Sequence, residues 1–146
     1  MKINALGHVV LRVSDLARAE AFYQGILGLP LCAHFDENGL KMAFFTLGNH
    51  HDFAVMEVAG DGKNRGEGEV GLDHVAFNIG TSMDELREAH RYLTEQGITT
   101  NPVDHEVTKS LYLSDPDSNG IELYIDASDV WRKDPAKVAQ LAPLEI

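Results

Sequence analysis

Four residues with the chemistry of metal ligands occupy matching places in the two halves of this 146-residue chain. His8 and His74 are 66 positions apart, and Glu57 and Glu122 are 65 apart. A lone histidine on a strand is more often solvated or hydrogen-bonded than a ligand. The matched spacing favours a shared role. Two imidazoles and one carboxylate with open positions suit non-haem Fe(II), and the same atoms suit Zn²⁺, Ni²⁺ or Mn²⁺ with a fourth ligand.

The elements that carry these residues repeat along the chain. In the first half the patterning predicts a strand at 6–13, a helix at 14–28 and strands at 41–48 and 52–59, with Ser14 as the helix N-cap and Gly28 near its end. In the second half it predicts a strand at 72–79, a helix at 81–97, and strands at 109–115 and 120–126. Ser82 and Glu85 form a possible capping box for the second helix. One further short strand is expected in each half, around Cys32 and ahead of Tyr112.

Each half therefore has the order βαβββ, and one such module cannot bury its sheet alone. The sequence predicts an α+β fold in which two tandem βαβββ modules form one curved mixed sheet, with the helices outside. We expect a single domain over residues 1–146. It comprises module one (about 6–59), a Gly-rich linker (about 60–71), module two (about 72–126) and a tail (127–146) anchored by Trp131.

Strand alternation indicates which side chains share a face. Glu122 shares one with Tyr124, and His8 shares one with Arg12. If the strand around residue 55 has no bulge, His51 lies on the face of Glu57, and His50 points to the other side. Tyr112 belongs to the strand that should form a hairpin with the strand of Glu122.

Bulk composition limits the classes of function. The formal net charge is −11 and the few basic residues are scattered, so nucleic acid is not an expected partner. No apolar stretch approaches the roughly 20 residues that span a bilayer. The one cysteine, Cys32, excludes an internal disulfide and is expected to pack inertly. No signal-peptide pattern is visible, and a cytoplasmic location is expected.

Three stretches resemble the vicinal oxygen chelate superfamily, which includes glyoxalase I, extradiol dioxygenases and bleomycin-resistance proteins. They are "GHVVLRVSDLARAEAFYQGILGL", "LDHVAFNI" and "LYLSDPDSNGIELY", and the resemblance covers about residues 6 to 126. It implies paired βαβββ modules that form a cup with a metal on its floor. It also implies a homodimer, in which exchange of modules between chains can build the site.

Two branches of the superfamily fit. The resemblance to extradiol dioxygenases implies metal ligation by His8, His74 and Glu122. Around the substrate it implies catalytic roles for His51, His105 and Tyr112. The metal would be Fe(II), with Mn, Ni or Zn as other possibilities, and the reactants would be a catechol-like small molecule and O₂.

The resemblance to glyoxalase I implies a lactoylglutathione lyase with four ligands, which adds Glu57 to the same set. Arg12 matches a position used there to bind glutathione. Arg12 and Tyr124 are candidate substrate-binding residues. We favour the dioxygenase because "NHHD" (49–52) and "DHEVTKSLYL" (104–113) are poorly explained by glyoxalase chemistry.

Overall fold

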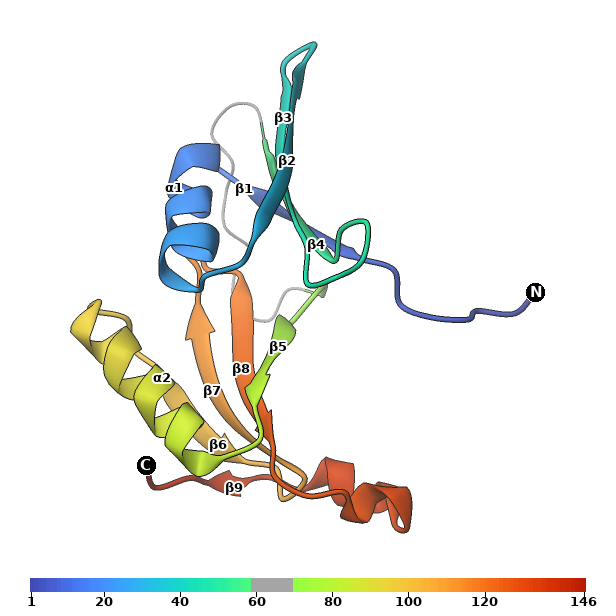
Figure 1. Cartoon of the computed structure of the whole chain (residues 1–146), viewed down its shortest axis with the longest axis vertical. Coiled ribbons are helices and arrows are strands. Elements are labelled where there is room, and N and C mark those ends of the chain that lie inside the picture. The colour runs from blue at the N-terminus through green and yellow to red at the C-terminus, as the bar shows by residue number, and fades with distance from the viewer. Residues whose placement is uncertain (59–69) are drawn as a thin grey trace. The chain divides into compact units, whose positions relative to one another are not determined.

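The computed structural model describes residues 1–58 and 70–146, which form two compact units (Figure 1). The first unit contains the chain up to Val70 together with the turn Asp115–Asn119. The second contains Gly71–Ser114 and Gly120–Ile146. The expected linker at 60–71 falls almost entirely outside the described residues. The predicted α+β class and both βαβββ modules are confirmed, each with its own sheet.

The first unit is a four-stranded mixed sheet with the strand order β1-β4-β3-β2. Strand β1 runs parallel to β4, and the other neighbours are antiparallel. Helix α1 packs against β3 and β4, where large apolar side chains form the core around the fully buried Tyr23. The bounds are β1 Val9–Val13, α1 Leu16–Glu20, β2 Leu31–Glu37, β3 Leu40–Phe45 and β4 Phe53–Glu57.

The start of α1 differs from the prediction. Asp15, not Ser14, is the N-cap, and its side chain accepts a hydrogen bond of 2.8 Å from Arg18 N. Ser14 instead donates to Asp117 from its backbone N (3.0 Å) and from Oγ (2.6 Å). The helix continues as a π-helical segment, Ala21–Ile26. It ends before Gly28, whose φ of 73° suits a glycine at a helix stop.

The turn Asp115–Asn119 is a structural part of the first unit. Asp115 accepts a 2.8 Å hydrogen bond from the buried Tyr23 hydroxyl and further bonds from the backbone N of Asp117 and Asn119. Burial, and then the neighbouring charge of Asp115, raises the pKa of Tyr23 far above its ordinary value. Tyr23 therefore stays a neutral donor that ties this turn to the core.

The second unit is a five-stranded sheet with the order β5-β8-β7-β6-β9. Strand β5 runs parallel to β8, and the other neighbours are antiparallel. Helix α2 packs on this sheet and begins with the predicted capping box between Ser82 and Glu85. The bounds are β5 His74–Gly80, α2 Met83–Glu95, β6 Asn101–Asp104, β7 Thr108–Ser114, β8 Gly120–Asp126 and β9 Ala142–Pro143.

Trp131, the expected anchor of the tail, is 40% exposed, and its ring lies under the guanidinium of Arg132. The tail also pairs with the sheet through β9, which lies next to β6. One expectation about a single residue is wrong. Cys32 is exposed rather than packed, with its thiol directed to Phe44 O at 3.3 Å. Within the described part of the chain, no helix is both long and apolar enough to cross a bilayer.

Candidate metal centre

The second unit brings His74 and Glu122 together. His74 begins β5 and Glu122 lies in the parallel neighbour β8, two residues beyond the position paired with His74. Their Nε2 and Oε2 atoms are 3.0 Å apart. Two ligand atoms each about 2.1 Å from one ion, at a right angle, are separated by about 3.0 Å. The pair therefore has the spacing of two adjacent ligands of one metal.

The hydrogen bonds around this pair also fit a cation. His74 Nδ1 lies 2.7 Å from Asp73 Oδ2, and this shorter of the two carboxylate contacts of the ring favours the tautomer with its proton on Nδ1. In the neutral ring Nε2 then has a lone pair, which faces the carboxylate oxygen of Glu122. Two acceptors at 3.0 Å repel unless a proton or a metal ion lies between them. A carboxylate behind a histidine is the usual outer support of a metal-binding imidazole.

Glu122 is 8% exposed, and its second carboxylate oxygen, Oε1, accepts a hydrogen bond from a buried side chain. The fully buried Ser110, on the neighbouring strand β7, donates a 2.5 Å hydrogen bond to Glu122 Oε1. A buried carboxylate is costly unless its charge is compensated and its oxygens are bonded. Ser110 supplies the bond and leaves Oε2 directed toward His74.

Tyr112 and His105 form a second polar pair in the same unit. Tyr112 is the cross-strand neighbour of Glu122, and its ring meets that of His74 edge to face, with 5.3 Å between centroids. His105 Nδ1 lies 2.9 Å from the backbone oxygen of Gln140, and Nε2 lies 3.0 Å from the Tyr112 hydroxyl. A carbonyl only accepts, so Nδ1 is protonated and the Tyr112 hydroxyl donates to Nε2.

The tyrosine is poised as a donor. Partial burial, followed by the charge of Glu122, raises the pKa of Tyr112 to about 12. Asp104, which directly precedes His105, bonds to Lys109 and to the backbone N of Glu106. The orientation of His105 is therefore set by the tail of the chain and not by its neighbour in sequence.

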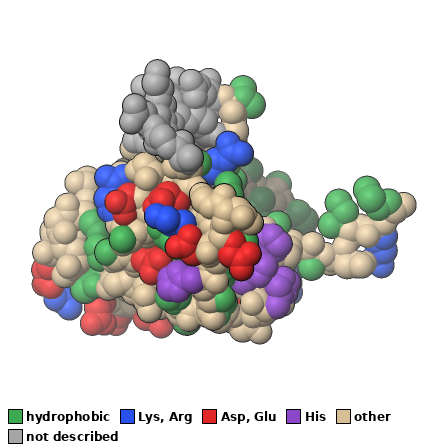
Figure 2. All heavy atoms as spheres, turned by 90° about the horizontal axis from the view of Figure 1, so that it is seen from above, with side chains coloured by type: hydrophobic (Ala, Val, Ile, Leu, Met, Phe, Trp, Pro, Cys, Tyr) green, Lys and Arg blue, Asp and Glu red, His purple; other side chains and the backbone are tan. Residues whose placement is uncertain are grey.

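His8 and His51 lie together in the first unit. His8 directly precedes β1, so it is not within the strand as predicted. Its ring centroid is 4.2 Å from that of His51 and 6.1 Å from that of His50, which corrects the expectation that His50 points away. Burial lowers the pKa of His51 first, and the neighbouring histidines lower it further. Histidine side chains gather beside the extended N-terminal segment in Figure 2.

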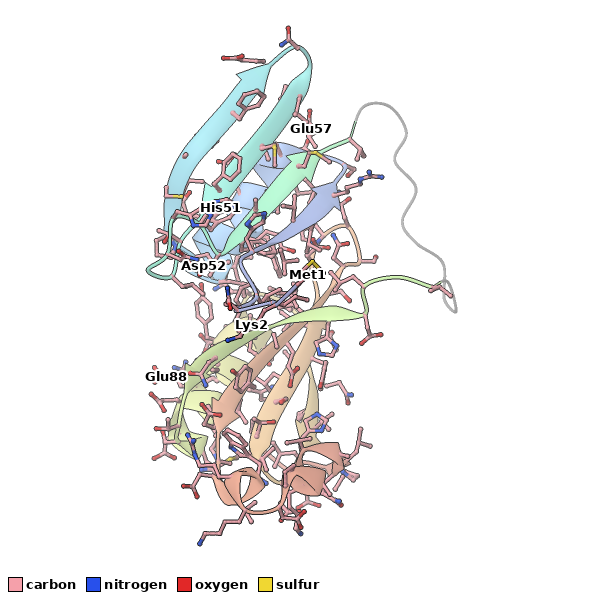
Figure 3. All side chains as sticks on the ribbon, turned by 90° about the vertical axis from the view of Figure 1, so that its right-hand side faces the viewer. Met1, Lys2, His51, Asp52, Glu57 and Glu88 are labelled. Atoms are coloured by element: carbon pink, nitrogen blue, oxygen red, sulfur yellow. The ribbon has the colours of Figure 1, made fainter. Side chains whose placement is uncertain are left out.

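Glu57 has a structural task at the far end of β4 from His51 (Figure 3). Its Oε2 accepts a 2.9 Å hydrogen bond from Leu16 N, in the first turn of α1, and its Oε1 lies 3.2 Å from Lys41 Nζ. The backbone bond, followed by Lys41, lowers the pKa of Glu57. Both oxygens are therefore occupied by groups of the first unit.

Strand register separates Glu57 from His8. The backbone N of Val9 bonds to Asp52 O, and Val13 pairs with Glu57, five residues further along β4 than Asp52. At about 3.3 Å per residue, that is roughly 16 Å along the strand. Glu122 is only two residues beyond the partner of His74. The first module does not reproduce the ligand pair of the second.

The superfamily profile described as Glyoxalase/Bleomycin resistance protein/Dioxygenase matches residues 5–123. The chain belongs to this superfamily. Biphenyl-2,3-diol 1,2-dioxygenase 3 of Rhodococcus globerulus is 37% identical over 124 residues, which cover 83% of this chain and 63% of that protein. Lactoylglutathione lyase of Salmonella typhimurium is 32% identical over 131 residues, which cover 86% of this chain and 94% of the lyase.

A solved glyoxalase/bleomycin resistance protein/dioxygenase domain from Frankia sp. EAN1pec has the same fold, with a TM-score of 0.72. It is 23% identical, and the match covers 86% of this chain and 99% of that one. The chain spans about three fifths of the two biphenyl-2,3-diol dioxygenases that it matches, 63% and 61% of their lengths. The superfamily is thus secure, and its members differ in reaction.

Sequence reasoning missed three residues that support the candidate site: Asp73, Ser110 and Gln140. Asp73 precedes His74 in the sequence, and that adjacency was the one available signal. Ser110 sits two residues before Tyr112, so it shares that strand face, yet a serine on a strand carries no distinctive pattern. Gln140 contacts His105 through its backbone oxygen, so its residue type could not have predicted this contact. Of the candidate substrate contacts, Arg12 is exposed and Tyr124 is half-buried.

Proposed function

We propose that this protein is a metal-dependent extradiol dioxygenase of the catechol 2,3 type, which cleaves the ring of a catecholic substrate with O₂. The observation that carries the proposal is the pairing of His74 Nε2 with Glu122 Oε2, buttressed by Asp73 and Ser110, beside the Tyr112–His105 pair. The similarity to a biphenyl-2,3-diol dioxygenase supports it. Substrate identity and the homodimer remain parts of the proposal.

In this proposal His74 and Glu122 hold the metal, and His8 is the third ligand by its place in the repeat. Fe(II) is the metal that we favour, because two histidines and one carboxylate leave open positions for small ligands. Mn, Ni or Zn would also suit the donor atoms. When bound, Fe(II) supplies the redox chemistry that joins a diol to O₂, which otherwise react slowly. The metal and its three ligands carry a net charge of +1, which attracts a catecholate despite the acidic chain.

Side chains of the protein donate and accept the protons that the reaction requires. Tyr112 is protonated at neutral pH because its pKa is about 12, and on substrate binding it turns its one hydroxyl proton from His105 Nε2 to a substrate oxygen. His105 Nε2 is then free to accept a proton released by the substrate. His51, whose pKa is lowered, is neutral near pH 7 and can accept a proton from the diol. Arg12 and Tyr124 are proposed substrate contacts.

The alternative is a glyoxalase I-type lyase, favoured by the 94% coverage of the Salmonella lactoylglutathione lyase. In that reaction a metal acts as a Lewis acid and a ligand carboxylate moves a proton. It uses four ligands, including Glu57. The engagement of both Glu57 oxygens by Leu16 N and Lys41 argues against that role.

One experiment separates the two. The protein is purified anaerobically, loaded with Fe(II) and offered catechol, 3-methylcatechol and 2,3-dihydroxybiphenyl in an oxygen electrode. We expect O₂ uptake together with a yellow ring-opened product. Absence of uptake with every diol, combined with Ni²⁺-dependent turnover of methylglyoxal and glutathione, would replace the dioxygenase with the lyase. Light scattering on the same preparation measures whether the chain is a dimer.

A further inference from the structure

A cluster of three imidazoles lies in the first unit. One ligand nitrogen from each of His8, His50 and His51 lies within 4.8 Å of the other two. The ring centroids of His50 and His51 are 4.5 Å apart and their planes are perpendicular. His8 and His50 are exposed and His51 is half-buried, so ions have access from solvent.

The loop that carries His50 and His51 is internally fixed. Asp52 Oδ2 accepts hydrogen bonds from the backbone N of Leu47 (2.6 Å) and of Asn49 (3.4 Å). Thr46 Oγ1 donates to Asn49 O at 2.6 Å. These bonds hold the backbone of the loop between β3 and β4 in one shape, which places the backbone of His50 and His51 beside His8.

One histidine of the cluster is already oriented as a ligand. His50 Nδ1 lies 3.2 Å from Asn49 Oδ1, which accepts its proton and leaves Nε2 with a free lone pair. A ligating histidine usually donates its second ring nitrogen to an oxygen in this way. The carboxylate of Asp52, next in sequence to His51, and the chain's formal charge of −11 further favour the binding of a cation.

We propose that His8, His50 and His51 form a second metal site, which takes Zn²⁺, Cu²⁺ or Ni²⁺ through three neutral imidazoles. These are the divalent ions that imidazole ligands suit. Nitrogens on one tetrahedral zinc are about 3.3 Å apart, so movements of roughly 1 Å by these surface side chains would close the site. Unlike the proposed catalytic set of His8, His74 and Glu122, this site has no carboxylate ligand, so it favours the ions that imidazole alone suits.

Because His8 belongs both to the imidazole site and to the proposed catalytic metal site, an ion at the imidazole site should affect activity. If His8 also binds the catalytic metal, as the proposed function holds, an ion at the imidazole site withdraws that ligand. Zn²⁺ or Cu²⁺ would then inhibit the enzyme in competition with Fe(II). This inhibition rests on the proposed function, whereas binding at the three imidazoles does not.

The binding test uses the full chain stripped of metal, in a His74→Ala background that disables the other site. Zn²⁺ affinity is measured by competition with a chromophoric chelator, and Cu²⁺ is added for electron paramagnetic resonance to count coordinated nitrogens. We expect three imidazole nitrogens on Cu²⁺. Adding His50→Ala should lower the Zn²⁺ affinity at least about tenfold and reduce the count to two.

The matched control is His90→Ala, because His90 lies on α2 and its Nδ1 bonds to Thr100 Oγ1 at 2.7 Å. It should leave both readouts unchanged. Fewer than three nitrogens on Cu²⁺, or equal Zn²⁺ affinity with and without His50, overturns the proposal. Circular dichroism verifies that the variants fold, and His50→Gln is a second exposed-site variant with the same expected result.

The inhibition test uses the intact site. In Fe(II)-loaded protein with a diol substrate, His50→Ala should shift the Zn²⁺ inhibition curve, scaled to that variant's own activity without Zn²⁺, to at least about tenfold higher concentration. An unchanged inhibition curve refutes the competition. If no diol is turned over, the proposed function fails, and the nitrogen count still decides the imidazole site.

Discussion

Ser110→Ala tests whether Glu122 is a metal ligand held by the core. The hydroxyl of Ser110 is fully buried and donates a 2.5 Å hydrogen bond to Glu122 Oε1. Without this hydrogen bond the carboxylate of Glu122 can rotate, and Oε2 is no longer held toward His74. Removing an outer support of a metal ligand costs about 10- to 100-fold in metal affinity, which corresponds to about 1.4–2.7 kcal/mol.

The same substitution should destabilise the metal-free protein. A hydrogen bond to a charged group contributes about 1.5–3 kcal/mol, and a 2 kcal/mol loss lowers the melting temperature of a domain of this size by about 4–8 °C. Alanine fills nearly the volume of serine, so no large cavity adds to this cost.

Fe(II) or Co²⁺ affinity is measured by chelator competition, and melting by circular dichroism with and without metal. Ser114→Ala is the matched control, since Ser114 lies on the same strand but is exposed. We expect the Ser110→Ala protein to lose more stability with metal than without it. A metal affinity within twofold of the unchanged protein, alongside a lowered melting temperature, would refute the ligand role of Glu122 and leave Ser110 as a packing residue.

Three further outcomes are expected. Glu57→Gln should keep full metal content and dioxygenase activity, because both carboxylate oxygens serve Leu16 N and Lys41; loss of metal by elemental analysis would instead support a four-ligand site. A chain that ends at residue 139 lacks the Gln140 oxygen and β9, so kcat should fall at least about tenfold and its pH profile should change, whereas a chain that ends at residue 144 keeps both and should not differ. The pKa of Glu85 is lowered by hydrogen bonds from the backbone N of Thr81 and from the hydroxyl and backbone N of Ser82, so the carboxylate stabilises the fold above pH 4.5 and this stabilisation is lost as the pH falls through the lower pKa of the folded state. The difference in melting temperature between Glu85→Gln and the unchanged protein should therefore shrink in that pH range. A difference that does not depend on pH would contradict this prediction.

Hydrogen bonds could be predicted from the sequence where both partners are close together in the chain. The capping box of Ser82 and Glu85 was predicted because both partners lie within one helical turn. The N-cap of α1 was misassigned because Asp117, about a hundred residues away in sequence, binds Ser14 and leaves the cap to Asp15. Composition and spacing contain no record of that distant competitor.

The candidate site followed the same rule. His74 and Glu122 were singled out by the matched spacing of the repeat and Tyr112 by the superfamily resemblance, and the structure places all three on neighbouring strands of one sheet. The tautomer of His105 was not, since its partner is a backbone oxygen of the tail. The prediction that His50 points away assumed an unbulged strand through residue 51. The structure begins β4 at Phe53 and places both histidines in the preceding loop, where alternation does not apply.

The repeat itself explains why Glu57 looked like a ligand. Equal spacing in sequence implies equal place in space only if the two modules share a strand register. In the second module Ala76 pairs with Glu122, two residues after His74. In the first, the pair two residues after His8 is Val10 with Ala54, so the structural counterpart of Glu122 is the buried Ala54.

An alanine at that position cannot bind a metal, and Glu57 lies three residues further along β4, at the start of α1. The register shift thus gives the two modules different tasks for their matching glutamates. Introducing Ala54→Glu would test this: with the register as described, it should add a carboxylate beside His8 and raise Zn²⁺ affinity even in a His74→Ala background. No gain in a folded variant would show that the register, and with it the counterpart assignment, is wrong.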